Sequence, residues 1–319
     1  MDCIIFGGPE MSLTLLENIQ IPPAISTYVT EILKEPALLI GCRAIGQGVP
    51  KPCCEYDIMI LSNEHGPHKV MKLGSCWAEL IYVPLKSTAM KVMSDGVDEI
   101  VLNDTSDFWL SSIRNTVLHN ARRNSNRSAI ARRSLISCLM RYVEIERMSQ
   151  KDLIVSSMLL KISAYEFLQS LVSFSGLPGS PLHQLEIIRR TLEPNQFESD
   201  SISLALEIIG VERATDSVLR RSIPSYTRLA ADRYDRSLIE AKIKFLYESG
   251  MTADCYYFIG RICSDILKSL DSAFWHTYGK LIQIGMDLSM DIEHIQRWNS
   301  QLNLAAKRLL RSHRTVIAG

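Results

Sequence analysis

The sequence lacks several features that would assign it to a broad class of proteins at once. Its 35 basic and 35 acidic residues cancel, so no net field draws the chain to nucleic acid or to a membrane, and an anionic partner would need a local patch. No apolar run reaches the length of a membrane span, and the start Met1-Asp2-Cys3 has no basic segment followed by an apolar core. We therefore expect a protein without a membrane segment that resides in the cytoplasm.

Familiar chemical motifs are missing as well. There is no GxxxxGK loop, no zinc ribbon and no Ser-His-Asp order. The eight cysteines include no CxxC pair and follow no regular spacing, so we expect reduced thiols instead of a disulfide framework. We expect the adjacent Cys53 and Cys54 to act as small apolar side chains and not as metal ligands.

What is present is enough apolar sequence for two cores, with 46% hydrophobic residues. Short runs rich in Ile, Val and Leu alternate with turn residues up to about residue 104, and the apolar period becomes helical after it. The sequence therefore predicts an α+β protein, with one domain over residues 1–104 and an all-helical region over residues 105–319. More than two hundred helical residues are many for one bundle, so we expect an extra helical lobe after about residue 195.

Local signals divide the helical region further. Ser106 or Asp107 is expected to cap its first helix, which would run through Trp109. Breaks are predicted at residues 175–181, 193–195 and 223–225, where Gly and Pro occur.

The most informative stretch runs from Ala37 to Leu61. An apolar run over residues 37–40 predicts a buried strand, and Gly41 permits the turn that would aim backbone amides at an anion. A second predicted strand begins with Glu55 and Asp57. Because side chains at i and i+2 of a strand share a face, both carboxylates can reach one hard cation such as Mg²⁺.

This stretch resembles the signature of the DNA polymerase β-like nucleotidyltransferases, in which a Gly-Ser turn and a short helix precede Asp-x-Asp on a strand. Gly41, Ala44, Gly46 and Asp57 match that pattern over roughly the first hundred residues. The resemblance implies a small mixed sheet and a third carboxylate on a later strand, for which Glu79 is the candidate. It also implies a triphosphate site that would include Gly41, Cys42, Arg43 and Gly46.

The implied activity is transfer of a nucleoside monophosphate from an NTP to an acceptor hydroxyl, with Mg²⁺ held by Glu55, Asp57 and Glu79. Glu79 would serve as third metal ligand or as base. Two positions depart from the pattern, because Cys42 replaces the usual Ser and Glu55 replaces the first Asp. The alternative is therefore a catalytically degenerate module that binds nucleotide or RNA without turnover.

Eight arginines, and only two acidic residues, lie between Arg114 and Arg147, a bias that suits phosphate groups or equally a solvated helix face. Arg114 and His119 resemble the Arg-x4-His motif of HEPN helical domains, some of which cleave RNA, and Arg308 with His313 repeats the spacing. A ribonuclease is thus a second alternative. The eight arginines of this segment are Arg114, Arg122, Arg123, Arg127, Arg132, Arg133, Arg141 and Arg147.

A further helical stretch, residues 157–183, is similar to the companion domain of minimal nucleotidyltransferases of the kanamycin nucleotidyltransferase type. That resemblance implies a homodimer and a substrate cleft between the two domains. Lys161, Tyr165 and His183 would then face the cleft. The acceptor, a small molecule, an RNA or a protein, stays open.

Overall fold

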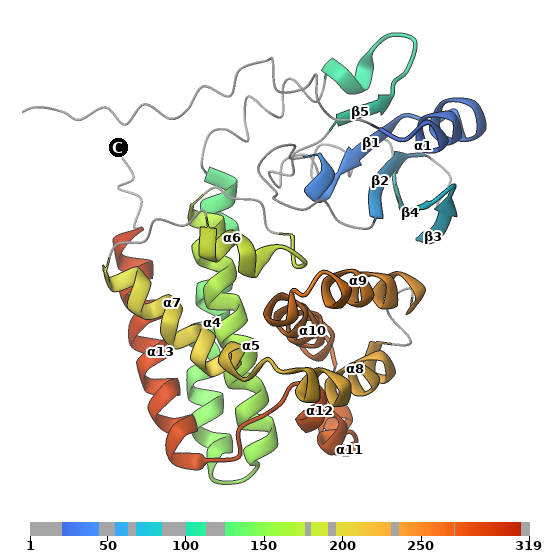
Figure 1. The fold of residues 1–319 in the computed structure, drawn as a ribbon. Helices are drawn as coiled ribbons and strands as arrows, with labels where there is room; N and C mark the ends of the chain where they lie inside the picture. The colour runs from blue at the N-terminus through green and yellow to red at the C-terminus, as the bar shows by residue number, and fades with distance from the viewer. Residues whose placement is uncertain are drawn as a thin grey trace, which may run out of the picture.

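A five-stranded mixed sheet followed by a largely helical region makes up the computed structural model of the chain (Figure 1). The structure describes residues 21–44, 55–62, 68–84, 100–112, 125–175, 180–190, 196–230, 236–270 and 272–313. The predicted α+β class is confirmed. Within these ranges no helix combines the length and apolar character needed to cross a bilayer.

The sheet has the strand order β3-β4-β2-β1-β5. β2 and β4 run parallel, whereas the other neighbouring strands pair antiparallel. β1 and β2 are the most buried strands, as their continuous apolar residues predicted. The strands are β1 (Ala37–Ile40), β2 (Glu55–Leu61), β3 (Lys69–Leu73), β4 (Cys76–Val83) and β5 (Ile100–Asn103).

The two faces of the sheet are covered differently. α1 (Pro23–Thr27) and η2 (Tyr28–Leu33) place Ile25 and Val29 in one core with Ile58 and Ile60. On the opposite face, the ends of β2 and β4 form a smaller core that includes Leu61 and Leu110. The start of β2 lies on that same opposite face and carries carboxylates in place of apolar side chains.

The helical region is organised around α5 (Leu153–Phe174), which is apolar and buried on nearly all sides. It packs with α4 (Ser125–Ser149), α7 (Gln196–Ile209) and α13 (Ile292–Ser312). A second group consists of α8 (Asp216–Ala230), α9 (Arg236–Glu248), α10 (Thr252–Leu267), α11 (Ser272–Thr277) and α12 (Gly279–Gly285). α6 (Gln184–Arg190) and η5 (Val211–Arg213) are short connections.

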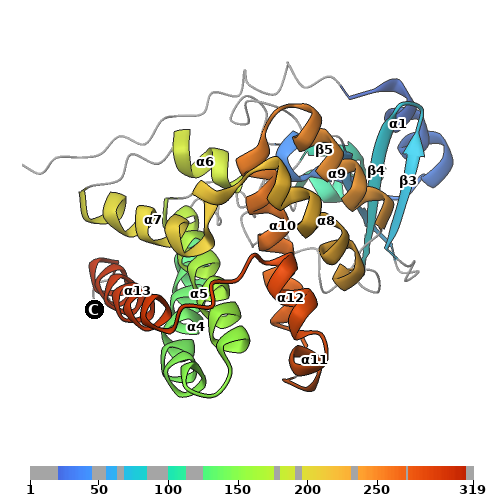
Figure 2. The ribbon, with the colours of Figure 1, turned by 60° about the horizontal axis from the view of Figure 1, so that its bottom comes forward.

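The helices nearest to the sheet are α9 and α10, as Figures 1 and 2 both show. α13 lies on the far side of the helical region (Figure 1). Only α9 and α10 among the described long helices therefore contribute side chains to the space beside the acidic start of β2.

Helix boundaries correct two expectations. Neither Ser106 nor Asp107 caps the first turn after β5; instead Asp104 accepts hydrogen bonds from the backbone N–H groups of Leu110 and Ser111, each at 2.9 Å. The break predicted at 223–225 is wrong, because α8 continues through Pro224. The buried face of α8 packs against α10 and α12, which outweighs the hydrogen bond that proline removes.

Candidate functional site: an acidic cluster beneath a lysine

Strand register brings three carboxylates together. β2 and β4 pair in parallel with Asp57 opposite Glu79, and Glu55 precedes Asp57 by two positions on the same face. Asp57 forms a side-chain hydrogen bond with Glu79. We call Glu55, Asp57 and Glu79 the acidic cluster. The three predicted site carboxylates thus lie side by side.

Gly41, the first residue after β1, lies directly beside the carboxylate of Asp57. It has φ +76°, and a Cβ built on it would lie 2.2 Å from Oδ2 of Asp57. A side chain at this position would therefore clash with the carboxylate and strain the backbone. The glycine expected to form an anion-binding turn is in this structure the residue that lets Asp57 approach the chain after β1.

A lysine from the helical region lies over the cluster. Nζ of Lys242, on α9, is 2.8 Å from Oε1 of Glu55 and 3.8 Å from Oε2 of Glu79. The side chain of Glu55 is 3% exposed and that of Lys242 is 18% exposed, so this ion pair is largely shielded from water. Glu79 also contacts His68, with Nε2 of the histidine 2.6 Å from its Oε1.

The protonation behaviour of the cluster follows from burial and close charges. Burial raises the pKa of Asp57, and the neighbouring charge of Glu55 raises it further. Burial alone would lower the pKa of Lys242, but the charges of Glu55, Asp57 and Glu79 outweigh burial and raise it. The site therefore holds a charged lysine and a carboxyl group that retains its proton more strongly than an exposed aspartate does.

A cavity of about 260 Å³ opens beside the cluster, between the sheet and α9 and α10. Its polar lining includes the acidic cluster, Lys242 and His68, and its apolar lining includes Phe258 and Ile262 of α10. A cavity with apolar walls and a few converging polar groups is typical of a small-molecule site. The cavity gives the acidic cluster access to a ligand.

Carboxylate oxygens are the ligand type that Mg²⁺ prefers, and Oδ1 of Asp57 is buried without a hydrogen-bond partner. The arrangement nevertheless does not fit a metal ion. Across the described ranges no group of three His, Cys, Asp or Glu side chains is placed to hold one. Glu55 is engaged by Lys242, and Glu79 is engaged by His68 and Asp57. The donors are of the right kind, but the ammonium group of Lys242 lies among them.

The residues expected to bind the triphosphate do not gather at the acidic cluster as the three carboxylates do. Arg43 turns toward Tyr56, on the sheet face opposite the cluster; its Nη1 donates to the tyrosine hydroxyl at 2.9 Å and its guanidinium lies 4.0 Å from the ring centroid. Cys42 is buried and disulfide-bonded, so the expectation of reduced thiols is wrong at this position. Gly46 lies outside the described residues. Cys76, Cys138, Cys255 and Cys263 carry free thiols.

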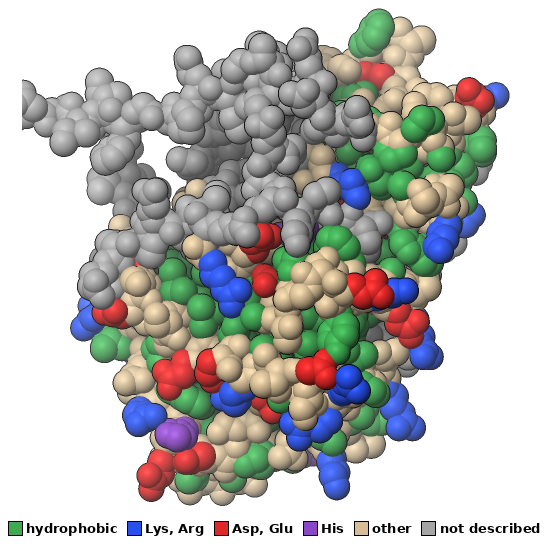
Figure 3. Space-filling model, viewed as in Figure 1, with side chains coloured by type: hydrophobic (Ala, Val, Ile, Leu, Met, Phe, Trp, Pro, Cys, Tyr) green, Lys and Arg blue, Asp and Glu red, His purple; other side chains and the backbone are tan. Residues whose placement is uncertain are grey.

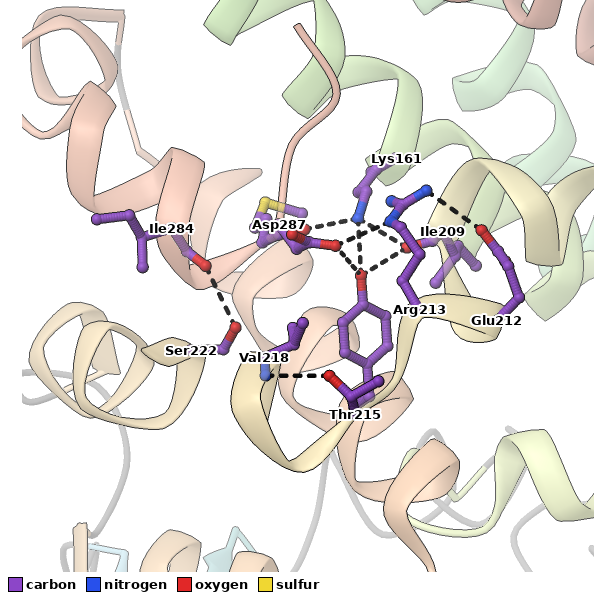
Figure 4. Close-up of polar contacts among 11 residues, drawn as sticks. Lys161, Ile209, Glu212, Arg213, Thr215, Val218, Ser222, Ile284 and Asp287 are labelled. Carbon is purple, nitrogen blue, oxygen red and sulfur yellow. Dashed lines mark hydrogen bonds and ion pairs between the residues drawn. The ribbon is translucent and has the colours of Figure 1, made fainter. Parts of the chain in front are cut away.

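Lys161, expected to face a cleft, lies inside the helical region (Figure 4). Its Nζ donates to the backbone carbonyls of Ile209 at 2.7 Å and Met286 at 2.6 Å. Tyr165 and His183 are fully or almost fully buried too. None of the three lines the cavity beside the acidic cluster.

The arginine-rich segment falls only partly within the described residues. The side chains of Arg132 and Arg141 are engaged, the first with the backbone carbonyl of His313 and the second with Glu166. Arg133 and Arg147 are exposed. On the face that Figure 3 shows, basic and acidic side chains are interspersed over the helical region. Arg114, Arg122 and Arg123, and the side chain of Arg127, lie outside the described residues.

The two Arg-x4-His spacings have different outcomes. His119 lies outside the described residues, so its role stays a prediction. His313 ends α13, and its ring stacks on Phe174 with the centroids 4.0 Å apart. The second spacing therefore belongs to packing of the helical bundle.

Sequence reasoning missed Lys242, the residue most closely tied to the cluster. A signal existed, because α9 places Leu238, Ile239, Ile243 and Leu246 on its buried face and Lys242 falls within that same stripe. A lysine in an apolar stripe indicates a buried acidic partner. The sequence did not reveal which carboxylates would meet it.

A comparison of the chain with known protein families, curated proteins and solved structures finds no match. The nucleotidyltransferase and HEPN resemblances therefore rest on the residues quoted for them.

Proposed function

We propose that this protein transfers a nucleoside monophosphate from an NTP to an acceptor hydroxyl, and that the reaction takes place in the cavity beside the acidic cluster. The single observation that carries the proposal is the register of β2 and β4. It aligns Asp57 with Glu79, next to Glu55, on the face that opens into the cavity.

The residues around the cavity suit parts of this reaction. Glu79 lies between His68 and Asp57, so it is positioned to accept a proton from an acceptor hydroxyl that enters the cavity. The apolar residues of α10 would exclude water from the acceptor side. The amides of Gly41 and Cys42 remain the proposed contacts for the triphosphate, and Mg²⁺ remains the proposed cofactor, although no step is assigned to a metal in the present arrangement.

An assay with α-phosphate-labelled NTP tests the proposal. The labelled nucleotide is incubated with the full chain and with RNA, protein or small polyols as acceptors, with and without EDTA. Label transfer by the wild type that is lost in Asp57→Asn supports the proposal. Glu240→Gln is the matched control, because Glu240 lies on the outer face of α9 in an exposed pair with Arg236. Equal transfer by Asp57→Asn and the wild type would overturn it.

A second candidate is a module that binds nucleotide or RNA without turnover. The observation that favours it is Lys242, whose ammonium group takes up the carboxylates that a transferase would use. Saturable NTP binding without label transfer to any acceptor would support this candidate. RNA cleavage that persists in EDTA and disappears in His119→Ala would instead support the ribonuclease alternative.

A further inference from the structure

We propose that the outer side of α4 is a binding surface for the same side of a second copy of this chain, with the two α4 helices antiparallel. This surface lies apart from the acidic cluster, because α4 packs on α5 and α13 and none of its described residues lines the cavity. The proposal is therefore independent of the proposed nucleotidyl transfer and is tested without it.

Exposed side chains recur along α4 at intervals of three and four residues. Ile136 is 49% exposed, Met140 73% and Val143 67%. Arg133 and Arg147, both exposed, continue the same spacing at the two ends of this apolar group. A mean interval of 3.5 residues is typical of the seam along which two helices pair. We call these five residues the outer stripe.

α4 carries apolar side chains on two opposite sides. Leu135, Cys138 and Ile145, on its inner side, belong to the core of the helical region. The neighbouring α13 behaves as an ordinary surface helix: over its described length the exposed positions are polar or charged except for Leu304. A single exposed leucine needs no partner, whereas a line of apolar side chains on a second helix face indicates a surface that is covered in solution.

The outer side of α4 is divided lengthwise into an apolar edge and a charged edge. With 3.6 residues per turn, Ile136 and Val143 project to one side of Met140. Arg133 and Glu144 project to the other side. A parallel pair of helices would bring the apolar edge of one copy against the charged edge of the other. An antiparallel pair, related by a two-fold axis at Met140, brings like edges together.

The antiparallel pairing satisfies both edges. On the apolar edge, Ile136 of one copy packs against Val143 of the second copy, and Met140 meets its own equivalent at the axis. On the charged edge, Arg133 comes within one turn of Glu144 of the second copy, and the symmetry makes this ion pair twice. Apolar contact and charge are thus complementary between two copies of one surface, which identifies the partner as this chain itself.

Sedimentation equilibrium of the full chain over a series of concentrations tests the surface. We expect the wild type to form a dimer and Met140→Glu to weaken it at least about hundredfold, because two like charges would meet at the axis. Ile32→Glu is the matched control, since Ile32 is 65% exposed but lies in η2 beside the sheet, and it should dimerise as the wild type does. Val143→Glu provides a second variant if Met140→Glu does not fold. A monomeric wild type, or undiminished dimers of the folded stripe variants, would overturn the proposal.

A charge exchange tests the antiparallel arrangement. Arg133→Glu and Glu144→Arg should each weaken the dimer about tenfold, and the double variant should recover most of the wild-type affinity. Additive losses in the double variant would contradict the pairing of these two residues.

Cross-linking tests the position of the two-fold axis. When oxidised with diamide, Met140→Cys should give an interchain disulfide above the level of the wild type, because residue 140 faces its own equivalent. Ala129→Cys should not, because the two copies of this exposed position lie about 33 Å apart in the antiparallel pair. Cross-linking through Ala129→Cys would show a parallel pair and overturn the arrangement.

Discussion

A buried lysine, Lys161, and a largely shielded one, Lys242, have opposite surroundings. Lys161 lies in the helical region among neutral acceptors, the carbonyls of Ile209 and Met286 and the hydroxyl of Tyr256. Lys242 lies between the helical region and the sheet, against the carboxylates of Glu55 and Glu79. Both side chains are mostly shielded from bulk water, yet they are held by different kinds of interaction.

The difference shows that the partners of a buried lysine, more than its burial, decide its charge. Burial, reinforced by the charge of Arg213, lowers the pKa of Lys161 to about 7. The same desolvation acts on Lys242, but its carboxylate neighbours outweigh it and raise the pKa. Lys161 thus joins helix ends within one core, whereas Lys242 acts as a fixed positive charge for the acidic cluster.

The largest effect should come from removing the fixed charge. Lys242→Met leaves the acidic cluster without a counter-charge, and breaking a buried ion pair from one side costs about 3–5 kcal/mol. We expect a decrease of that size in the free energy of unfolding, measured by urea denaturation at pH 7 in EDTA. Lys244→Met should stay within about 0.5 kcal/mol of the wild type, as exposed substitutions usually do. Equal losses in Lys242→Met and Lys244→Met would show that Lys242 does not act as a fixed counter-charge for the acidic cluster.

The next effect is the pH dependence of stability that the lowered pKa of Lys161 should produce. Its pKa is lowered from 10.5 to about 7, so the unfolded chain binds this proton more tightly than the folded chain does. The contribution of Lys161 to stability is therefore lowest below pH 7 and rises as the pH increases toward 10, by at most about 1.4 kcal/mol per pH unit.

Lys161→Met provides the comparison for this pH dependence. Between pH 7 and pH 10 the wild type should gain about 3–4 kcal/mol of stability relative to the variant, in urea titrations at matched salt. A constant difference between the two proteins over that range would show that Lys161 keeps its charge in the folded state.

A smaller effect is expected at the backbone that closes the acidic cluster. Gly41→Ala combines a positive φ with a methyl group directed at the carboxylate of Asp57, and we expect a loss of about 2 kcal/mol. Gly250→Ala is the matched control, because Gly250 also has a positive φ of +70° but nothing within 4 Å of the added Cβ. Similar losses in both variants would mean that backbone strain alone explains the effect and that Asp57 is not crowded.

The smallest expected effect concerns Asp57. Because burial raises its pKa, the folded protein favours the protonated acid, and this part of stability is lost as the pH rises from the usual aspartate range through the raised pKa. Asp57→Asn mimics the protonated form, so at pH 7 it should melt at or slightly above the wild type, by about 0–1 kcal/mol. The difference should vanish near pH 4. A variant that is less stable at pH 7 would indicate an ionised, well-paired Asp57.

The parts of the site that were predictable are those encoded by local periodicity. The alternation of a strand placed Glu55 and Asp57 on one face, and the resemblance suggested Glu79 as their partner. The sequence could not show that Lys242 meets them, because that contact joins elements far apart in the chain. It also could not separate Lys161 from a cleft residue, since both would interrupt an apolar helix in the same way.

Helix boundaries, like the contacts of the site, were predictable from the sequence only in part. The α+β class and the change to helical period after β5 followed from the apolar pattern. The continuation of α8 through Pro224 did not, because it depends on tertiary packing against α10 and α12. The cap was misplaced because Asp104 reaches forward over six and seven residues, beyond the spacing of a usual N-cap.

The position of Lys242 in the chain has a consequence for synthesis. Ribosomes produce the sheet strands before α9, so a sheet that folds first brings its three carboxylates together without the lysine that pairs with them. During that interval protons or cations from the surrounding solution have to balance the carboxylates. A sheet in that state depends on the ions around it, and Lys242 takes over their part once α9 packs beside the cluster.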